Sequence, residues 1–160
     1  VPDGGDDALE VGPGRREVVE PADGLDTGFH TDGKQTTDFG SGDDRAYGVA
    51  MRKNSNVTDA GVVLAGYADN GTDKDFAIAQ YNINGNADTY FDSDGELTVD
   101  FGSGDDEAHA IYMEKQGAGD IVVAGYASNG SNNDFAAARP NLQGIIAAVG
   151  DGCWVGVRTA

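Results

Sequence analysis

A stretch of about 60 residues occurs twice in this chain of 160 residues. Residues 26–53 recur 62 positions later with 16 of 28 residues identical, and residues 61–85 recur 59 positions later with 13 of 25 identical. The three extra residues of the first copy fall within residues 54–60, and insertions inside repeats map to loops. The duplication predicts two copies of one supersecondary unit that pack on each other.

The repeat also predicts how the chain is divided. We expect an acidic N-terminal segment, only partly ordered, at residues 1–24, a first repeat at residues 25–86 and a second repeat at residues 87–144. Residues 145–160 depart from the repeat, and their apolar runs around Gly150-Asp151-Gly152 predict a C-terminal hairpin or cap.

Each repeat contains four short runs bounded by Gly, Asp, Asn and Ser, a pattern typical of β-strands joined by turns. Four-stranded antiparallel units with small residues on their faces are typical of propeller blades, and closure normally takes about four to eight of them. We therefore expect an all-β fold of two four-stranded blade-like repeats, either a β-propeller fragment or a partial propeller that self-assembles. The runs are residues 35–39, 46–52, 62–68 and 76–81 in the first copy and residues 97–101, 108–113, 121–127 and 135–139 in the second.

Two of the runs predict their own place in the sheet. Residues 62–68 are apolar on both faces, which indicates a central strand between neighbouring sheets. The second copy of residues 76–81 ends in Pro140, and proline is tolerated at a sheet edge, so the fourth run is expected to be an edge strand. Asn70-Gly71 and Asn129-Gly130 supply the positive φ that a hairpin between these two runs needs.

Composition excludes several classes of partner. The formal charge of −18 and the pI near 4.1 repel phosphate backbones and anionic lipid headgroups, so no nucleic-acid partner is expected. The chain has no apolar run of about 18 residues, so no membrane insertion is expected either. Its single cysteine, Cys153, rules out an internal disulfide.

Several blocks of the first repeat follow one another in a fixed order. They are Leu25-Asp26-Thr27-Gly28-Phe29, Gly33-Lys34, Thr37-Asp38-Phe39-Gly40 with Asp43-Asp44, Val63-Leu64-Ala65-Gly66-Tyr67 and Asp75-Phe76-Ala77-Ile78-Ala79. This order resembles the delta-60 repeat family of bacterial proteins, over about residues 25–144 or two units. The resemblance implies a β-propeller-like fold and an extracellular or cell-surface location, although this chain carries no signal peptide. It implies no activity and no catalytic residue, and Tyr90, Asp92-Ser93-Asp94 and Pro140 depart from the family's pattern.

Carboxylates in the loops are the candidates for ion binding, because Ca²⁺ takes about six to eight oxygen ligands at flexible spacing. Asp92, Asp94 and Glu96 are the first candidates, since they lie within five residues of one another. Short Asp side chains next to Gly also form turns without any ion. Calcium is the one cofactor that the sequence suggests, although nothing in the sequence requires a bound calcium ion.

The paired aspartates Asp43 and Asp44 recur at equivalent positions as Asp105 and Asp106. Two interpretations of these pairs stay open. They form a shared rim of the two blades that binds a ligand, or they build the turn that precedes the second run of each repeat.

No catalytic residue is predicted. The triplet Asp26-Thr27-Gly28 matches the aspartic-protease pattern, but its second copy reads Asp88-Thr89-Tyr90 and both belong to a linker of the repeat.

The leading hypothesis is a non-catalytic extracellular β-repeat module that acts as a scaffold or as a protein or glycan recognition surface. The alternatives are a calcium-stabilised adhesin module and part of a propeller enzyme that acts on polysaccharide. Because two blades leave open flanks, we also expect self-association or membership of a longer repeat protein.

Overall fold

Seven antiparallel strands form two sheets in the computed structural model, which describes residues 24–40, 42–52, 60–113 and 120–140. The first sheet has the order β1-β2-β3-β4 and the second has the order β5-β6-β7. Nearly all of the predicted N-terminal segment and the whole C-terminal hairpin lie outside the described residues. The strands are β1 Asp44–Arg52, β2 Gly61–Asp69, β3 Lys74–Asn82, β4 Glu96–Val99, β5 Asp106–Met113, β6 Ile121–Ser128 and β7 Asn133–Ala138.

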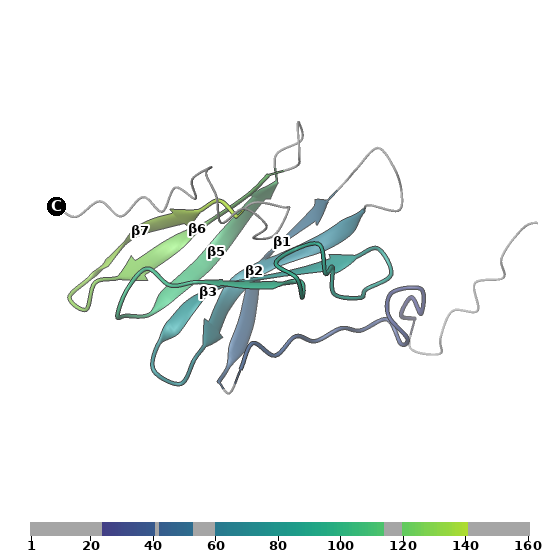
Figure 1. Ribbon diagram of the computed structural model, residues 1–160, viewed down its shortest axis with the longest axis horizontal. Coiled ribbons are helices and arrows are strands. Elements are labelled where there is room, and N and C mark those ends of the chain that lie inside the picture. Colours follow the sequence, from purple (N-terminus) through teal and green to yellow (C-terminus); the bar gives the residue numbers. More distant parts are fainter. Residues whose placement is uncertain (1–23, 41, 53–59, 114–119, 141–160) are drawn as a thin grey trace, which may run out of the picture.

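The predicted all-β fold is confirmed, and the two repeats give two sheets that stack on each other (Figure 1). Strand β5 of the second sheet contacts β1, β2 and β3 of the first. The first sheet has four strands, but one of them is not the strand predicted for its repeat, and the described residues give the second sheet three strands, so the two predicted four-stranded units are not formed as such. Both sheets are open in Figure 1, without a closed ring of blades among the described strands.

The sheets are offset from the sequence repeats, which differs from the predicted division between residues 86 and 87. Strand β4 belongs by sequence to the second repeat, yet it pairs with β3 of the first. The linker between them folds back because Phe91 is fully buried, and Gln80 N–H donates to the carbonyl of Gly95 at 2.8 Å. The equivalent residues 35–39 of the first repeat are extended but form no strand.

This offset explains why the expected edge strand was wrong in the first repeat. Strand β3 lies between β2 and β4 and is buried along most of its length. Pro140, which prompted the prediction, lies two residues beyond Ala138, the last residue of β7, and so interrupts no ladder bond there. The central position expected for residues 62–68 is confirmed, since β2 pairs with β1 on one side and with β3 on the other.

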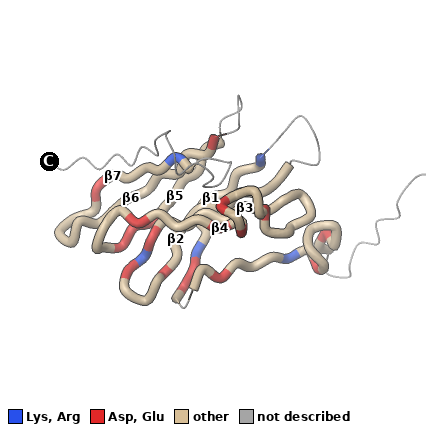
Figure 2. Tube along the Cα trace, viewed as in Figure 1, with Lys and Arg blue, Asp and Glu red and all other residues tan. Residues whose placement is uncertain are grey.

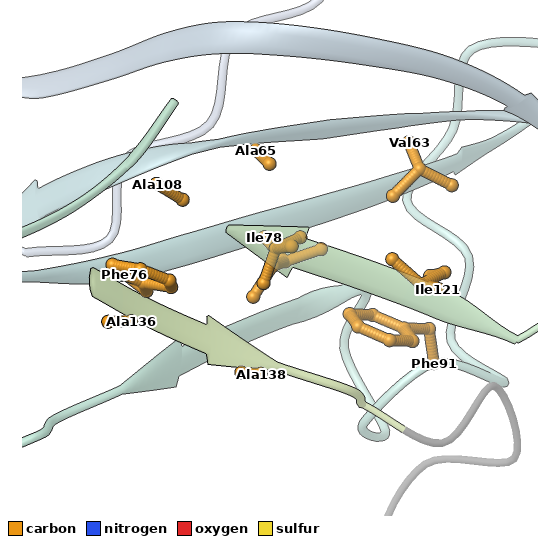
Figure 3. Packing of buried hydrophobic residues seen from close by; sticks show 10 residues of the cluster. Val63, Ala65, Phe76, Ile78, Phe91, Ala108, Ile121, Ala136 and Ala138 are labelled. Carbon is orange, nitrogen blue, oxygen red and sulfur yellow. The ribbon is translucent and has the colours of Figure 1, made fainter. Parts of the chain in front are cut away.

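The core lies between the two sheets. Phe76 and Ile78 of β3 point into it from the first sheet, while Ile121 of β6 and the small side chains of β7 close it from the second (Figure 3). The ring of Phe76 meets Phe101 edge to face with centroids 4.9 Å apart. The buried cluster comprises Val63, Ala65, Phe76, Ile78, Phe91, Ala108, Ile121, Val123, Ala136 and Ala138.

Strands β1 and β5 carry a bulge at the same position of the repeat. The pairing register shifts at Tyr47 in β1 and at His109 in β5, its equivalent 62 residues later. The glycines opposite, Gly66 and Gly125, approach the bulged strand so closely that a Cβ on Gly66 would lie 1.7 Å from the carbonyl oxygen of Arg45. The repeated Ala-Gly-Tyr-Ala block therefore reflects a close backbone approach rather than a turn.

The close approach at Gly66 can be tested with a single methyl group. Gly66→Ala should lower the free energy of unfolding by about 3 kcal/mol, because backbone rather than a flexible side chain must move. The matched control is Gly40→Ala, where a Cβ would meet no atom within 4 Å and where a change below about 0.5 kcal/mol is expected. Chemical denaturation followed by circular dichroism measures both, and equal losses would contradict the close approach.

Candidate functional site

The predicted aspartate pairs build turns. The Asp44 carboxylate accepts the backbone N–H of Phe39 at 2.9 Å, and Asp106 accepts that of Phe101 at 2.8 Å. The second oxygen of Asp106 accepts the N–H of Ser128 at 3.0 Å. These contacts support the turn interpretation for both residues, whereas ligand binding by the pairs stays a prediction.

Their neighbours Asp43 and Asp105 contribute through the backbone. The carbonyl of Asp43 accepts the N–H of Asp69, and that of Asp105 accepts the N–H of Ser128, each at 3.2 Å. The side chain of Asp105 also accepts the N–H of Lys74 across the junction of the two sheets. In both repeats, the turn that contains the aspartate pair is therefore hydrogen-bonded to the last residue of the second strand, which is Asp69 in β2 and Ser128 in β6.

The carboxylates predicted to bind calcium lie in the linker that leads into β4. Asp92 has a positive φ of 47°, and the Asp94 carboxylate accepts the N–H of Glu96 at 3.0 Å. The three side chains are not among the groups close enough to share one ion in the described part of the chain. Calcium binding stays a prediction, which the unfolding midpoint with and without a chelator tests.

A different carboxylate group forms where the two sheets meet. Asp75, Asp100 and Asp106 each offer an oxygen within 4.8 Å of the others. Burial raises the pKa of Asp75, although the hydrogen bond from Asn70 opposes it, and the charge of Asp100 adds to the rise. Burial likewise raises the pKa of Asp106 against the backbone hydrogen bonds from Phe101 and Ser128. Two carboxylates of the group are therefore harder to ionise than usual.

Asp75 is the member whose charge is least compensated. Its second oxygen is buried without a hydrogen-bond partner among the described residues, while the first accepts from Asn70 at 3.0 Å. Sequence reasoning singled out Asp106 but missed the group, because its three members come from β3, from the turn before β5 and from β5 itself. The signal present in the sequence was the recurrence of Asp75 as Asp134 at the same position of the repeat.

Neutralising Asp75 should stabilise the protein. Because its folded pKa is above the ordinary value, its contribution to stability is fully present below the unfolded pKa and is lost as pH rises through the folded pKa. Asp75→Asn should therefore raise the unfolding midpoint at pH 7 by roughly 2–4 °C, as about 1 kcal/mol does for a domain of this size. The gain should shrink towards acidic pH in thermal scans made with a chelator present.

The control for Asp75 is its repeat equivalent. Asp134 is exposed and accepts hydrogen bonds from the amides of Asn129 and Asn132, at 2.9 and 3.0 Å. Asp134→Asn should leave the midpoint unchanged or slightly lower. A stabilisation of the same size at both positions would show that lower net charge, rather than the carboxylate group, is responsible.

A second polar cluster surrounds Glu107, which is buried at the same junction. The Lys74 ammonium donates to Glu107 at 2.6 Å, and His109 lies 3.5 Å from the other carboxylate oxygen. Burial raises the pKa of Glu107, but hydrogen bonds from Lys74, Tyr126 and Tyr47 outweigh it and bring the pKa below its usual value. Glu107 is therefore an ionised group held by its partners.

Aromatic rings on β1 and β2 of the first sheet and on β5 and β6 of the second continue this cluster across the junction. Tyr47 stacks on His109 with centroids 4.6 Å apart and 15° between the planes. His109 lies 5.7 Å from Tyr126, and Tyr47 lies 5.9 Å from Tyr67. Burial and then the hydrogen bond to Glu107 raise the pKa of Tyr126 to about 12. These rings come from equivalent positions of the two repeats, so the cluster is built by the duplication.

The sequence signal for the Glu107 cluster is a difference of charge between the two copies of the repeat. Glu107 stands where the first repeat has Arg45, and Lys74 stands where the second repeat has Asn133. These changes give the facing sides of the two units opposite charges. A charge that changes between copies of a repeat therefore marked the ion pair at their junction.

Replacing Lys74 should show how strongly the buried Glu107 carboxylate destabilises the fold when it has lost this partner. Lys74→Met should lower the free energy of unfolding at pH 7 by roughly 1–3 kcal/mol, because Glu107 loses its charge partner. The folded pKa of Glu107 is lowered, so the pair's contribution is present above the unfolded pKa and is lost on acidification. The double variant with Glu107→Gln should recover part of the loss, and additive losses in denaturation curves would contradict the pairing.

Each sheet also has a face that the other does not cover. The outer face belongs to the second sheet and points away from the first, and it presents Ala110, Tyr112, Phe135 and Ala137. Phe135 is fully exposed and Tyr112 is 61% exposed. The back face belongs to the first sheet on its opposite side, with Val49, Met51, Leu64, Ala77 and Ala79.

A cavity of about 170 Å³ lies on the back face. The extended residues 35–39 form one wall, where Thr37 and Tyr81 share a hydrogen bond, and the sheet forms the other. Phe39, Leu64, Gly66, Ala77 and Ala79 are among the residues of its apolar lining.

Among the described residues, Asp and Glu are spread over the strand ends and loops of both sheets, while Lys and Arg are few (Figure 2). A scan against models of protein families, a search of curated proteins and a search of solved structures each gave no match. Over the described ranges, no helix has the length and apolar character needed to cross a membrane.

Proposed function

We propose that this chain is a non-catalytic β-repeat module of an exported bacterial protein, and that it works as a scaffold in which sheets stack in series like propeller blades. One observation carries the proposal. Phe76 is fully buried between the two sheets, whereas its repeat equivalent Phe135 is fully exposed on the outer face. Large exposed apolar groups mark interaction surfaces, so the outer face is a docking face for a further sheet.

Other positions of the repeat support the same conclusion. Ile111 and Met113 pack against the core, while their equivalents Val49 and Met51 on the back face are 64% and 50% exposed. Each side chain of the junction thus has a counterpart at an open end of the stack. The resemblance to the delta-60 repeat family, with its propeller-like fold, agrees with such a series.

We favour a protein over a glycan as the partner of the outer face. The exposed ring of Phe135 lies on β7, whose second edge has no ladder partner among the described strands. An open strand edge binds another strand through its backbone, which a glycan cannot provide.

The geometry gives little support to an enzyme that acts on polysaccharide. In such an enzyme, titratable groups with shifted pKa would line a cleft. The carboxylates with shifted pKa at the junction, Asp75, Asp106 and Glu107, are absent from the lining of the back-face cavity.

The scaffold role predicts that an added unit will bury Phe135. We consider a longer chain in which residues 1–144 are followed by residues 86–160, so that a third unit comes after the second. Phe135→Ala in the second unit should cost about 3–5 kcal/mol there, as for a buried ring, but within about 0.5 kcal/mol in the natural chain. Chemical denaturation of the natural chain and of the longer chain, each with and without Phe135→Ala, measures the two losses of stability.

Tyr90→Ala is the control, because Tyr90 is 84% exposed but lies in the linker before β4 and away from the outer face. It should be nearly neutral in both chains. If Phe135→Ala is as mild in the longer chain as in the natural one, the outer face does not accept a further sheet and the scaffold role is wrong.

A further inference from the structure

We infer that the outer face binds the back face of a second copy of this chain, in a head-to-tail contact that repeats the internal junction. The inference rests on the scaffold function proposed above and names its partner. The two faces differ from each other, so the contact is heterologous and leaves one free face at each end of the assembly.

The back-face cavity corresponds to the place that Phe76 fills inside the chain. Phe76 lies in one buried cluster with Val123, Ala136 and Ala138 and meets the ring of Phe101. The repeat equivalents of these four partners are Leu64, Ala77, Ala79 and Phe39, and all four line the cavity.

The ring that matches this cavity is the equivalent of Phe76, which is the exposed Phe135. A cavity of roughly 150 Å³ is known to accept benzene, so about 170 Å³ suits a phenyl ring. The chain therefore carries a cavity of suitable size on its back face and the matching ring on its outer face.

The backbone offers a second match. Strand β4 completes the first sheet, with Val99 opposite Phe76 and Leu97 opposite Ile78. The equivalent residues 35–37 alternate between half-buried and exposed, and they belong to neither ladder of the described sheets. In a second copy they would add a fourth strand to β7, with Thr37 opposite Phe135 and Gln35 opposite Ala137.

Side chains at the rim also fit. Inside the chain, Tyr47 of the first unit stacks on His109 of the second. In the proposed contact, His109 of one copy takes the place of Tyr47, and Tyr47 of the second copy takes the place of His109. A tyrosine therefore again stacks on a histidine.

Volumes compensate at a neighbouring position. Gly48 leaves just enough space for Ile111, whose Cγ2 would lie 3.0 Å from an added Cβ. The outer face has the larger Ala110 in place of Gly48, and the back face has the smaller Val49 in place of Ile111.

The test uses two full-length variants, each with one face blocked. Phe135→Asp blocks the outer face and Val49→Asp blocks the back face, and both residues are exposed, so folding should be unaffected. The wild type should associate progressively with concentration in sedimentation velocity at high salt, which screens the charge of −18. Each variant alone should dissociate about 30-fold more readily, as at an interface hot spot, and their mixture should form a one-to-one dimer.

The other outcomes overturn the inference. A monomeric wild type rules out the contact between copies, even if the three-unit chain has confirmed stacking. Association of the Val49→Asp variant alone shows outer face meeting outer face. A mixture that remains monomeric, while the wild type associates, shows that the copies meet through other surfaces.

Cross-linking tests the strand register, in a background with Cys153→Ser. Ala137→Cys is added to the variant with the blocked back face, and Gln35→Cys is added to the variant with the blocked outer face. Oxidation should join them into a heterodimer, because directly opposed residues of antiparallel strands lie within disulfide reach. Tyr90→Cys in place of Gln35→Cys should not cross-link, and equal yields would contradict the added strand.

Discussion

The insertion of the Phe76 ring between the two sheets is the interaction on which the rest of the structure depends. A ring on β3 can enter the second sheet only where that sheet presents small side chains, which Ala136 and Ala138 provide. Phe101 closes the site from the turn that precedes β5, and Asp106 fixes this turn by accepting the N–H of Phe101. The turn, the alanines and the ring therefore form one unit, whose parts come from both repeats.

This unit makes the stack directional. One side of each sheet supplies the ring, and the other supplies the small residues that receive it. One end of the two-unit stack consequently presents the exposed ring of Phe135, and the other end presents the cavity beside Phe39. Both end features follow from repeating one directional interface in an open series, and neither needs a separate functional explanation.

The sequence was sufficient for the features that are local to a repeat. Strand positions follow from the runs between turn residues, and Gly71 and Gly130 have the positive φ expected of the hairpins. The transfer of β4 to the preceding sheet was not predictable from the runs, because pairing depends on where the linker with Phe91 returns. The carboxylate group and the Glu107 pair were missed for a similar reason, since their members meet only when the sheets stack. Comparing equivalent positions for changes of charge, rather than for identity, would have pointed to Lys74 and Glu107.

The same comparison indicates how the internal and external contacts should differ. The internal junction contains the Lys74–Glu107 pair, whereas the corresponding positions at the open ends are Asn133 and Arg45, which cannot form a charge pair. The carboxylates equivalent to Asp75, Asp100 and Asp106 would be Asp134 of one copy with Asp38 and Asp44 of the next, so their repulsion is retained. A contact with a similar apolar pattern and the same repulsion but without the compensating ion pair is weaker than the one inside the chain. The two units of one chain therefore stay joined under conditions in which separate copies exchange, and ionic strength controls the second contact more than the first.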